Sequence, residues 1–154
     1  MSFITDTKRE LNLSKIPGRI AFYEQLITVA EVCFELDGKK LEELNKTQIK
    51  DLMVYDQMLQ ECKTIEDVVK NRIEELESEL YRTINETSQR ALGPKEIVQY
   101  IKSEPKYVLA QEIYMEVQHT RRRLESVVEA LKSLGWTLKR IVELRVNQLQ
   151  DSVL

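Results

Sequence analysis

The side chains that most often carry out catalysis are sparse in this chain. Its single histidine is His119, and its two cysteines, Cys33 and Cys62, stand apart from each other among apolar residues. A general base needs a positioned partner, and a zinc site needs several Cys or His ligands at close spacing. Neither a glycine-rich phosphate loop nor a nucleophile elbow nor an HExxH motif occurs. We therefore predict a protein that is not an enzyme and that holds no metal ion and no cofactor.

The two cysteines fit the core of a cytosolic protein best. Neither belongs to a CxxC pair, and each has apolar neighbours at helical spacing. We predict reduced core thiols, with a disulfide as the alternative. The first residues, MSFITDTKRE, lack a hydrophobic signal region, and no run approaches about 18 uninterrupted apolar residues. We expect a cytoplasmic protein without a membrane span.

Charged residues are the remaining candidates for function. The net charge is −3, but residues 1–94 carry 13 Lys or Arg and 18 Asp or Glu, whereas residues 95–154 carry 10 and 8. Positive charge gathers at Arg121–Arg123, at Lys132, Lys139 and Arg140, and at Lys70 with Arg72. Single clusters of this kind usually form a solvated face or ion pairs with nearby glutamates. A symmetric oligomer would multiply each cluster into a set of phosphate contacts.

The elements that carry these residues are predicted to be helices. Only four Gly and three Pro interrupt a chain rich in Glu, Lys, Leu, Gln and Arg. Ser14 can cap a first helix, and Asp37-Gly38 offers a turn. Thr64 to Asp67 resembles a capping box, which predicts a helix from Thr64 to about Ala91. The predicted fold is all-α: an N-terminal helical unit over residues 1–93, a Pro-bracketed elbow over 94–105, and a long C-terminal oligomerisation helix over 106–154.

That C-terminal helix shows a seven-residue apolar repeat. Its stripe consists of Leu124, Val127, Leu131, Leu134, Leu138 and Ile141. Such a stripe is typical of a helix that packs against another helix. At about 1.5 Å per residue the helix would be roughly 65–70 Å long, too long for one small core to cover. We predict that the stripe is buried against other copies of the chain, so that the protein is a homo-oligomer.

The segment from Val108 to Arg145, and most of all Ala130–Arg145 (ALKSLGWTLKRIVELR), resembles the C-terminal helix of UvsY-type recombination mediators of tailed phages. In that family a leucine-rich helix is followed by a small residue with an aromatic, then by an aliphatic-Lys-x-Ile segment that ends in an acidic residue and Arg. Gly135, Trp136, Lys139, Ile141 and Arg145 occupy these positions. The family also carries a Lys-x-Arg-aliphatic element on an earlier helix, and Lys70-Asn71-Arg72-Ile73 is similar to it.

The resemblance implies a small helical protein that forms a closed ring through its C-terminal helices. Such mediators bind single-stranded DNA, help displace the single-strand-binding protein and load a RecA-like recombinase, without covalent chemistry. The resemblance implies DNA contacts at Lys70 and Arg72. A second candidate surface is formed by Arg121, Arg122 and Arg123. A phage-encoded protein would act in the host cell cytoplasm. The alternative is a non-enzymatic helical adaptor or assembly protein that binds other proteins through the same C-terminal helix.

Overall fold

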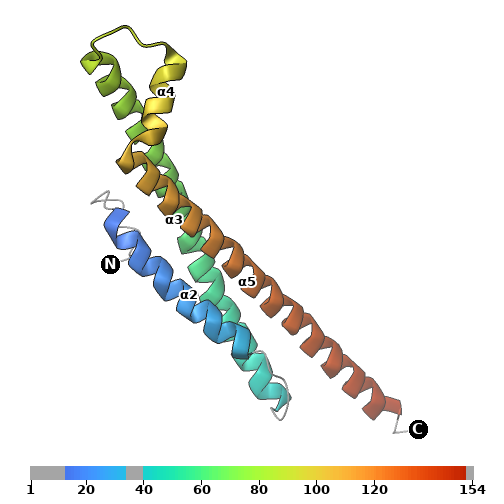
Figure 1. Ribbon diagram of the computed structural model, residues 1–154. Helices are drawn as coiled ribbons and strands as arrows, with labels where there is room; N and C mark the ends of the chain where they lie inside the picture. Colours follow the sequence, from blue (N-terminus) through green and yellow to red (C-terminus); the bar gives the residue numbers. More distant parts are fainter. Residues whose placement is uncertain (1–12, 34–39, 152–154) are drawn as a thin grey trace. The chain divides into compact units, whose positions relative to one another are not determined.

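A computed structural model describes residues 13–33 and 40–151, and the side chains of residues 13–30 and 40–148. In chain order the elements are the short 3-10 helix η1 (Leu13–Lys15) and the α-helices α2 (Ile16–Cys33), α3 (Leu41–Thr87), α4 (Pro94–Ser103) and α5 (Pro105–Asp151) (Figure 1). The described residues contain no strand, so the predicted all-α class is confirmed. The predicted turn at Asp37-Gly38 lies outside the described residues.

Helix α3 is longer than the sequence analysis predicted. It runs for 47 residues without a break, so the predicted helix start at Thr64 is wrong. The capping-box pattern is present, but Gly and Pro are absent from the whole of Leu41–Thr87, so nothing in the chain interrupts the helix there. Apolar burial also continues through this point at helical spacing, from Met58, Leu59 and Cys62 to Ile65 and Val69.

The chain divides into two compact units, and these do not follow the three predicted sequence ranges. The described residues of unit 1 are 13–22 and 61–121, and those of unit 2 are 23–60 and 122–151. Each unit therefore combines one stretch of α3 with one stretch of α5. The physical reason is that long helices pair with helices far away in the sequence, so a compact unit does not need a continuous segment of chain.

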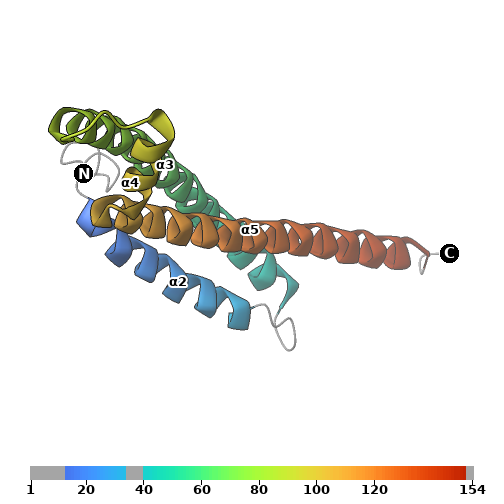
Figure 2. The ribbon, with the colours of Figure 1, turned by 45° about the horizontal axis from the view of Figure 1, so that its top comes forward.

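Unit 1 is held together by contacts between α3 and the first part of α5 (Figure 2). The Tyr107 hydroxyl donates a 2.7 Å hydrogen bond to Glu77 Oε1. This bond to a carboxylate, with partial burial, raises the pKa of Tyr107. The thiol of Cys62 lies 3.7 Å from the carbonyl oxygen of Val117. Cys62 is completely buried, as predicted for a core thiol, whereas the side chain of Cys33 lies outside the described set.

The predicted elbow is the short helix α4, and its ends have clear physical causes. Pro94 stands at the first helical position, where a missing amide donor costs little. The Gly93 amide donates a 3.0 Å hydrogen bond to Glu96 Oε2, which helps satisfy the start of the helix. Ile97 and Ile101 are buried one turn apart. The helix ends at Ser103 because Pro105 disfavours helical backbone at the residue before it.

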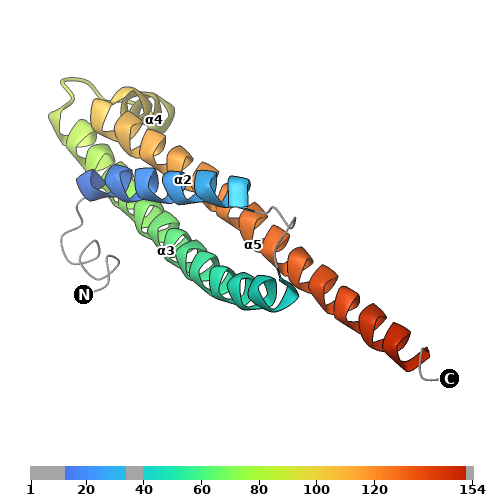
Figure 3. The ribbon, with the colours of Figure 1, turned by 90° about the horizontal axis from the view of Figure 1, so that it is seen from below.

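Unit 2 brings the later part of α2, the first part of α3 and the second part of α5 together (Figure 3). The Tyr55 hydroxyl donates a 2.8 Å hydrogen bond to the carbonyl oxygen of Leu26, which joins α3 to α2. Gln48 is one of the few buried polar side chains, and its Nε2 donates a 2.8 Å bond to the carbonyl oxygen of Leu131 on α5. Gly135 makes this approach possible, because a Cβ atom there would lie 2.8 Å from Gln48 Nε2.

We expect Gly135→Ala to lower the free energy of unfolding by about 1 kcal/mol. Alanine gains about 1 kcal/mol of helix propensity over glycine. Its methyl group displaces the Gln48 carboxamide, however, and a buried amide left without its hydrogen bond costs about 1–3 kcal/mol. Urea denaturation would measure the difference. In a Gln48→Ala background the same Gly135→Ala substitution should instead stabilise the protein; equal effects in both backgrounds would contradict the Gln48 contact.

Candidate nucleic-acid interface

Lys70 and Arg72 lie on the outer side of α3, in unit 1. The inner side of this stretch is apolar, with Ile65, Val69, Ile73 and Leu76 buried. Lys70 is exposed and Arg72 is half-buried. The surrounding outer positions are mainly acidic, so the two cations belong to a locally negative surface.

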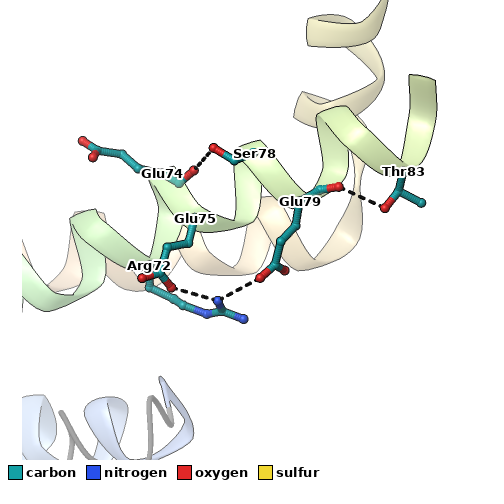
Figure 4. A network of polar contacts seen from close by, with 6 residues as sticks. All are labelled: Arg72, Glu74, Glu75, Ser78, Glu79 and Thr83. Atoms are coloured by element: carbon teal, nitrogen blue, oxygen red, sulfur yellow. Dashed lines mark hydrogen bonds and ion pairs between the residues drawn. The ribbon is translucent and has the colours of Figure 1, made fainter. Parts of the chain in front are cut away.

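Arg72 is already bound by carboxylates of its own helix. Its Nη1 donates a 3.0 Å hydrogen bond to Glu75 Oε2 and lies 3.5 Å from Glu79 Oε1 (Figure 4). The hydrogen bond to Glu75, with the charge of Glu79, raises the pKa of Arg72 above its ordinary value. A DNA phosphate that contacts this guanidinium must therefore displace or compete with two carboxylates. Lys70 is the more accessible cation of the pair.

The three consecutive arginines of α5 do not form one surface. The Nε atom of Arg121 lies 2.6 Å from Glu66 Oε2 in unit 1, in a largely buried pair. Arg123 pairs with Glu24 in unit 2. Arg122 is the exposed member of the three. Neighbouring residues of an α-helix point about 100° apart, so a run that is dense in sequence spreads around the helix. Arg121 and Arg123 each tie α5 to another helix within their own unit.

The predicted oligomerisation stripe is largely buried within the chain itself. Leu124, Val127, Leu131 and Leu138 are almost completely buried. Leu134 and Ile141 are half-buried. The prediction that the stripe is buried against another copy of the chain is therefore corrected for its four buried residues, Leu124, Val127, Leu131 and Leu138. In unit 2, the first part of α3 and the later part of α2 provide this apolar cover.

Beyond Ile141 the cover ends. In unit 2, α3 and α5 run in opposite directions, and α5 continues past the first turn of α3 (Figure 3). Gln48 contacts α5 at Leu131 and Gly135, so the start of α3 at Leu41 is level with α5 at about residues 138–142. Every residue from 142 to 148 is exposed, including Val142, Leu144 and Val146. We call residues 142–148 the α5 end.

One exposed aromatic on α5 was not assigned a role from the residues alone. Trp136 is 72% exposed, and Lys139 Nζ lies 5.7 Å from the centre of its ring. The family resemblance includes this tryptophan, next to Gly135, and assigns it no contact with DNA. Its position on the side of α5 away from the buried stripe follows from helical periodicity, and that signal was available without a structure.

Comparisons with protein-family models, with curated proteins and with solved structures find no match for this chain. Among the described residues, none of the helices combines the length and the apolar character of a membrane span. The same residues contain no group of three or more His, Cys, Asp or Glu side chains placed to hold a metal ion.

Substitutions in the arginine triplet test whether Arg121 stabilises the fold while Arg122 does not. We expect Arg121→Ala to lower the free energy of unfolding by about 1–3 kcal/mol, because it leaves the largely buried Glu66 carboxylate without its nearest cation. Arg122→Ala, at an exposed position, should change it by less than about 0.5 kcal/mol. Thermal or urea unfolding measures both. Equal losses for the two variants would show that the triplet acts as one patch.

Proposed function

We propose that this protein is a recombination mediator that binds single-stranded DNA as a homo-oligomeric ring and helps load a RecA-like recombinase in place of single-strand-binding protein. Two findings support the proposal. The segment Ala130–Arg145 resembles the C-terminal helix of UvsY-type mediators. The observation that carries the proposal is that the same helix continues beyond the reach of α3, with Val142, Leu144 and Val146 exposed at the α5 end.

The α5 end is suited to contact a second copy. Val142 continues the buried stripe past Leu138 and Ile141, and Leu144 and Val146 are also exposed. Burying one such aliphatic side chain is worth about 1.5–3 kcal/mol. Val142 and Val146 lie one turn apart on one side of the helix, so burial of this pair would favour association of helix ends. A closed ring satisfies every copy equally, because each subunit offers the same surface. Because the stripe residues from Leu124 to Leu138 are largely buried inside the chain, the proposed subunit contact is limited to the α5 end.

A ring would repeat each weak local charge once per copy, so that one strand could contact several copies. Each copy contributes exposed cations such as Lys70 and Arg122, while Arg72 would first have to exchange Glu75 and Glu79 for phosphate. Binding through the backbone needs little sequence preference and suits a strand that must be handed from one protein to another. No covalent step is part of this function, and the host cell cytoplasm would be its location.

The proposal predicts salt-sensitive binding to single-stranded DNA. Fluorescence anisotropy of a labelled oligothymidylate should show affinity falling by about 50-fold between about 50 and 200 mM salt if about four phosphates are contacted. Lys70→Ala with Arg122→Ala should weaken binding at low salt, because both cations are exposed. Lys95→Ala, which removes one exposed charge from α4, serves as a control and should have a smaller effect. An absence of binding at low salt would contradict the function.

Assembly can be tested without disturbing the core. Val142→Glu with Val146→Glu should reduce the particle mass measured by light scattering, since charges at the α5 end oppose its burial between copies. Both valines are exposed in the single chain, so helicity by circular dichroism should be unchanged. Val29→Glu changes an exposed valine of α2 and should leave the mass unaltered. A wild-type protein that is monomeric at micromolar concentration would rule out the ring.

A helical adaptor is the second candidate, and one observation favours it. An open hollow of about 460 Å³ lies between α3 and α4 in unit 1. Its lining mixes apolar and charged side chains: Glu77, Ser78, Tyr81, Arg82, Val98, Ile101 and Lys102. Such a hollow can receive a side chain of a partner protein, with apolar contacts at Val98 and Ile101 and polar contacts at its charged residues. Failure of DNA binding together with an oligomeric wild-type particle would favour the adaptor over the mediator.

A further inference from the structure

The outer face of α5 just before its uncovered end carries an aromatic ring among cations. Trp136 is 72% exposed, although a large indole is normally among the better-buried side chains. Lys132 precedes it by four residues, and Lys139 and Arg140 follow it by three and four, so all four side chains share one side of the helix. We call Lys132, Trp136, Lys139 and Arg140 the basic–aromatic face.

Two of the three cations on this face are available to a ligand. Lys132 Nζ lies 2.8 Å from Glu129 Oε1, and this pairing raises the pKa of Lys132. For Lys139 and Arg140, the described part of the chain shows no ion pair. Both are exposed, and Lys139 stays near the indole, 5.7 Å from the ring centre. Arg72, Arg121 and Arg123, in contrast, are each held by a carboxylate.

The ring and the two cations match the two chemical parts of an unpaired strand. A base has a flat apolar face that stacks on an aromatic side chain, and its phosphates carry the charge that Lys139 and Arg140 complement. Duplex DNA does not offer the face of a base, because its bases are stacked on each other. An exposed ring flanked by unengaged cations therefore favours a single strand over a duplex.

We propose that the basic–aromatic face is a binding site for single-stranded nucleic acid, with a base stacked on Trp136 and the flanking phosphates on Lys139 and Arg140. This inference rests on the single-strand binding proposed above and moves its main contact from Lys70 and Arg72 to α5. It also gives the Gly-Trp segment two separate tasks. Gly135 faces inward to Gln48, and Trp136 faces outward to the strand.

Trp136 is the only tryptophan of the chain, so intrinsic fluorescence reports on this face alone. Titration of the full-length protein with oligothymidylate should quench the tryptophan emission, and the quenching should saturate at the same DNA concentration as the anisotropy of a labelled oligothymidylate. Trp136→Ala should weaken binding by about tenfold, the loss expected for one stacked base. Trp136→Phe should restore most of the affinity, because a smaller ring can still stack.

Matched variants separate the site from general effects. Tyr100 is 53% exposed on α4, so Tyr100→Ala removes an aromatic ring elsewhere and should leave affinity unchanged. Lys139→Gln with Arg140→Gln should make the salt dependence of binding shallower by about one to two phosphate contacts. Circular dichroism should be the same for all these variants, since each side chain is exposed.

The outcomes distinguish this inference from the function on which it rests. If the oligonucleotide binds by anisotropy while tryptophan emission is unchanged and Trp136→Ala binds like wild type, the site is overturned and the single-strand function stands. If no binding occurs at low salt, both fall. If the emission is blue-shifted, varies with protein concentration and ignores DNA, a second copy covers Trp136, and the site is again overturned.

Discussion

The positions of glycine and proline along the chain determine how long its helices are and how they divide into compact units. Neither glycine nor proline occurs within Leu41–Thr87, and Gly135 is the single glycine or proline between Lys106 and Asp151. With so few of these residues, α3 and α5 each reach 47 residues, whereas Gly93-Pro94 begins α4 and Pro105 ends it after Ser103. Helices of that length exceed what one small core can cover. Two compact units are the result, each made from a different stretch of the same two helices.

Ion pairs account for much of the charged surface. Arg19 with Glu61 and Arg121 with Glu66 join helices in unit 1, and Arg123 with Glu24 joins helices in unit 2. An arginine used in this way is held in a partly desolvated position and offers less to a phosphate than an exposed one. The density of positive charge in the sequence is therefore a poor guide to binding. Lys139 and Arg140, on the outer side of α5, form no ion pair in the described part of the chain and lie beside the ring of Trp136.

Composition and periodicity were enough to predict the all-α class, the Pro-bracketed helix α4 and the start of α5 near Pro105. These features depend on local chemistry, namely helix propensity and the geometry of proline, which each segment carries with it. Four residues of the α5 stripe, Leu124, Val127, Leu131 and Leu138, are buried, whereas Leu134 and Ile141 are half-buried. The helices that cover these residues could not be predicted, because an apolar stripe indicates that a helix face is buried but does not indicate which helix buries it.

The remaining differences have a common origin in distant contacts. Thr64 carries a valid local start signal that the continuous burial on both sides of it overrides. Arg121 and Arg123 look like one cluster until Glu66 and Glu24, far away in the sequence, are brought beside them. Gln48 gives no sign of its role, since a glutamine in a polar helix is usually exposed. Only the pairing of α3 with α5 reveals that it is buried.

That glutamine has a consequence for the length of the uncovered helix. Gln48 donates to one particular carbonyl, that of Leu131, and Gly135 alone leaves room for it there. A slip of α3 along α5 by one turn, about 5.4 Å, would bring the Gln48 amide against a residue with a side chain and cover or expose one more turn of the α5 end. The hydrogen bond between Gln48 and Leu131 thus fixes the register of α3 against α5. This register determines how many residues of α5 extend past the start of α3 in unit 2.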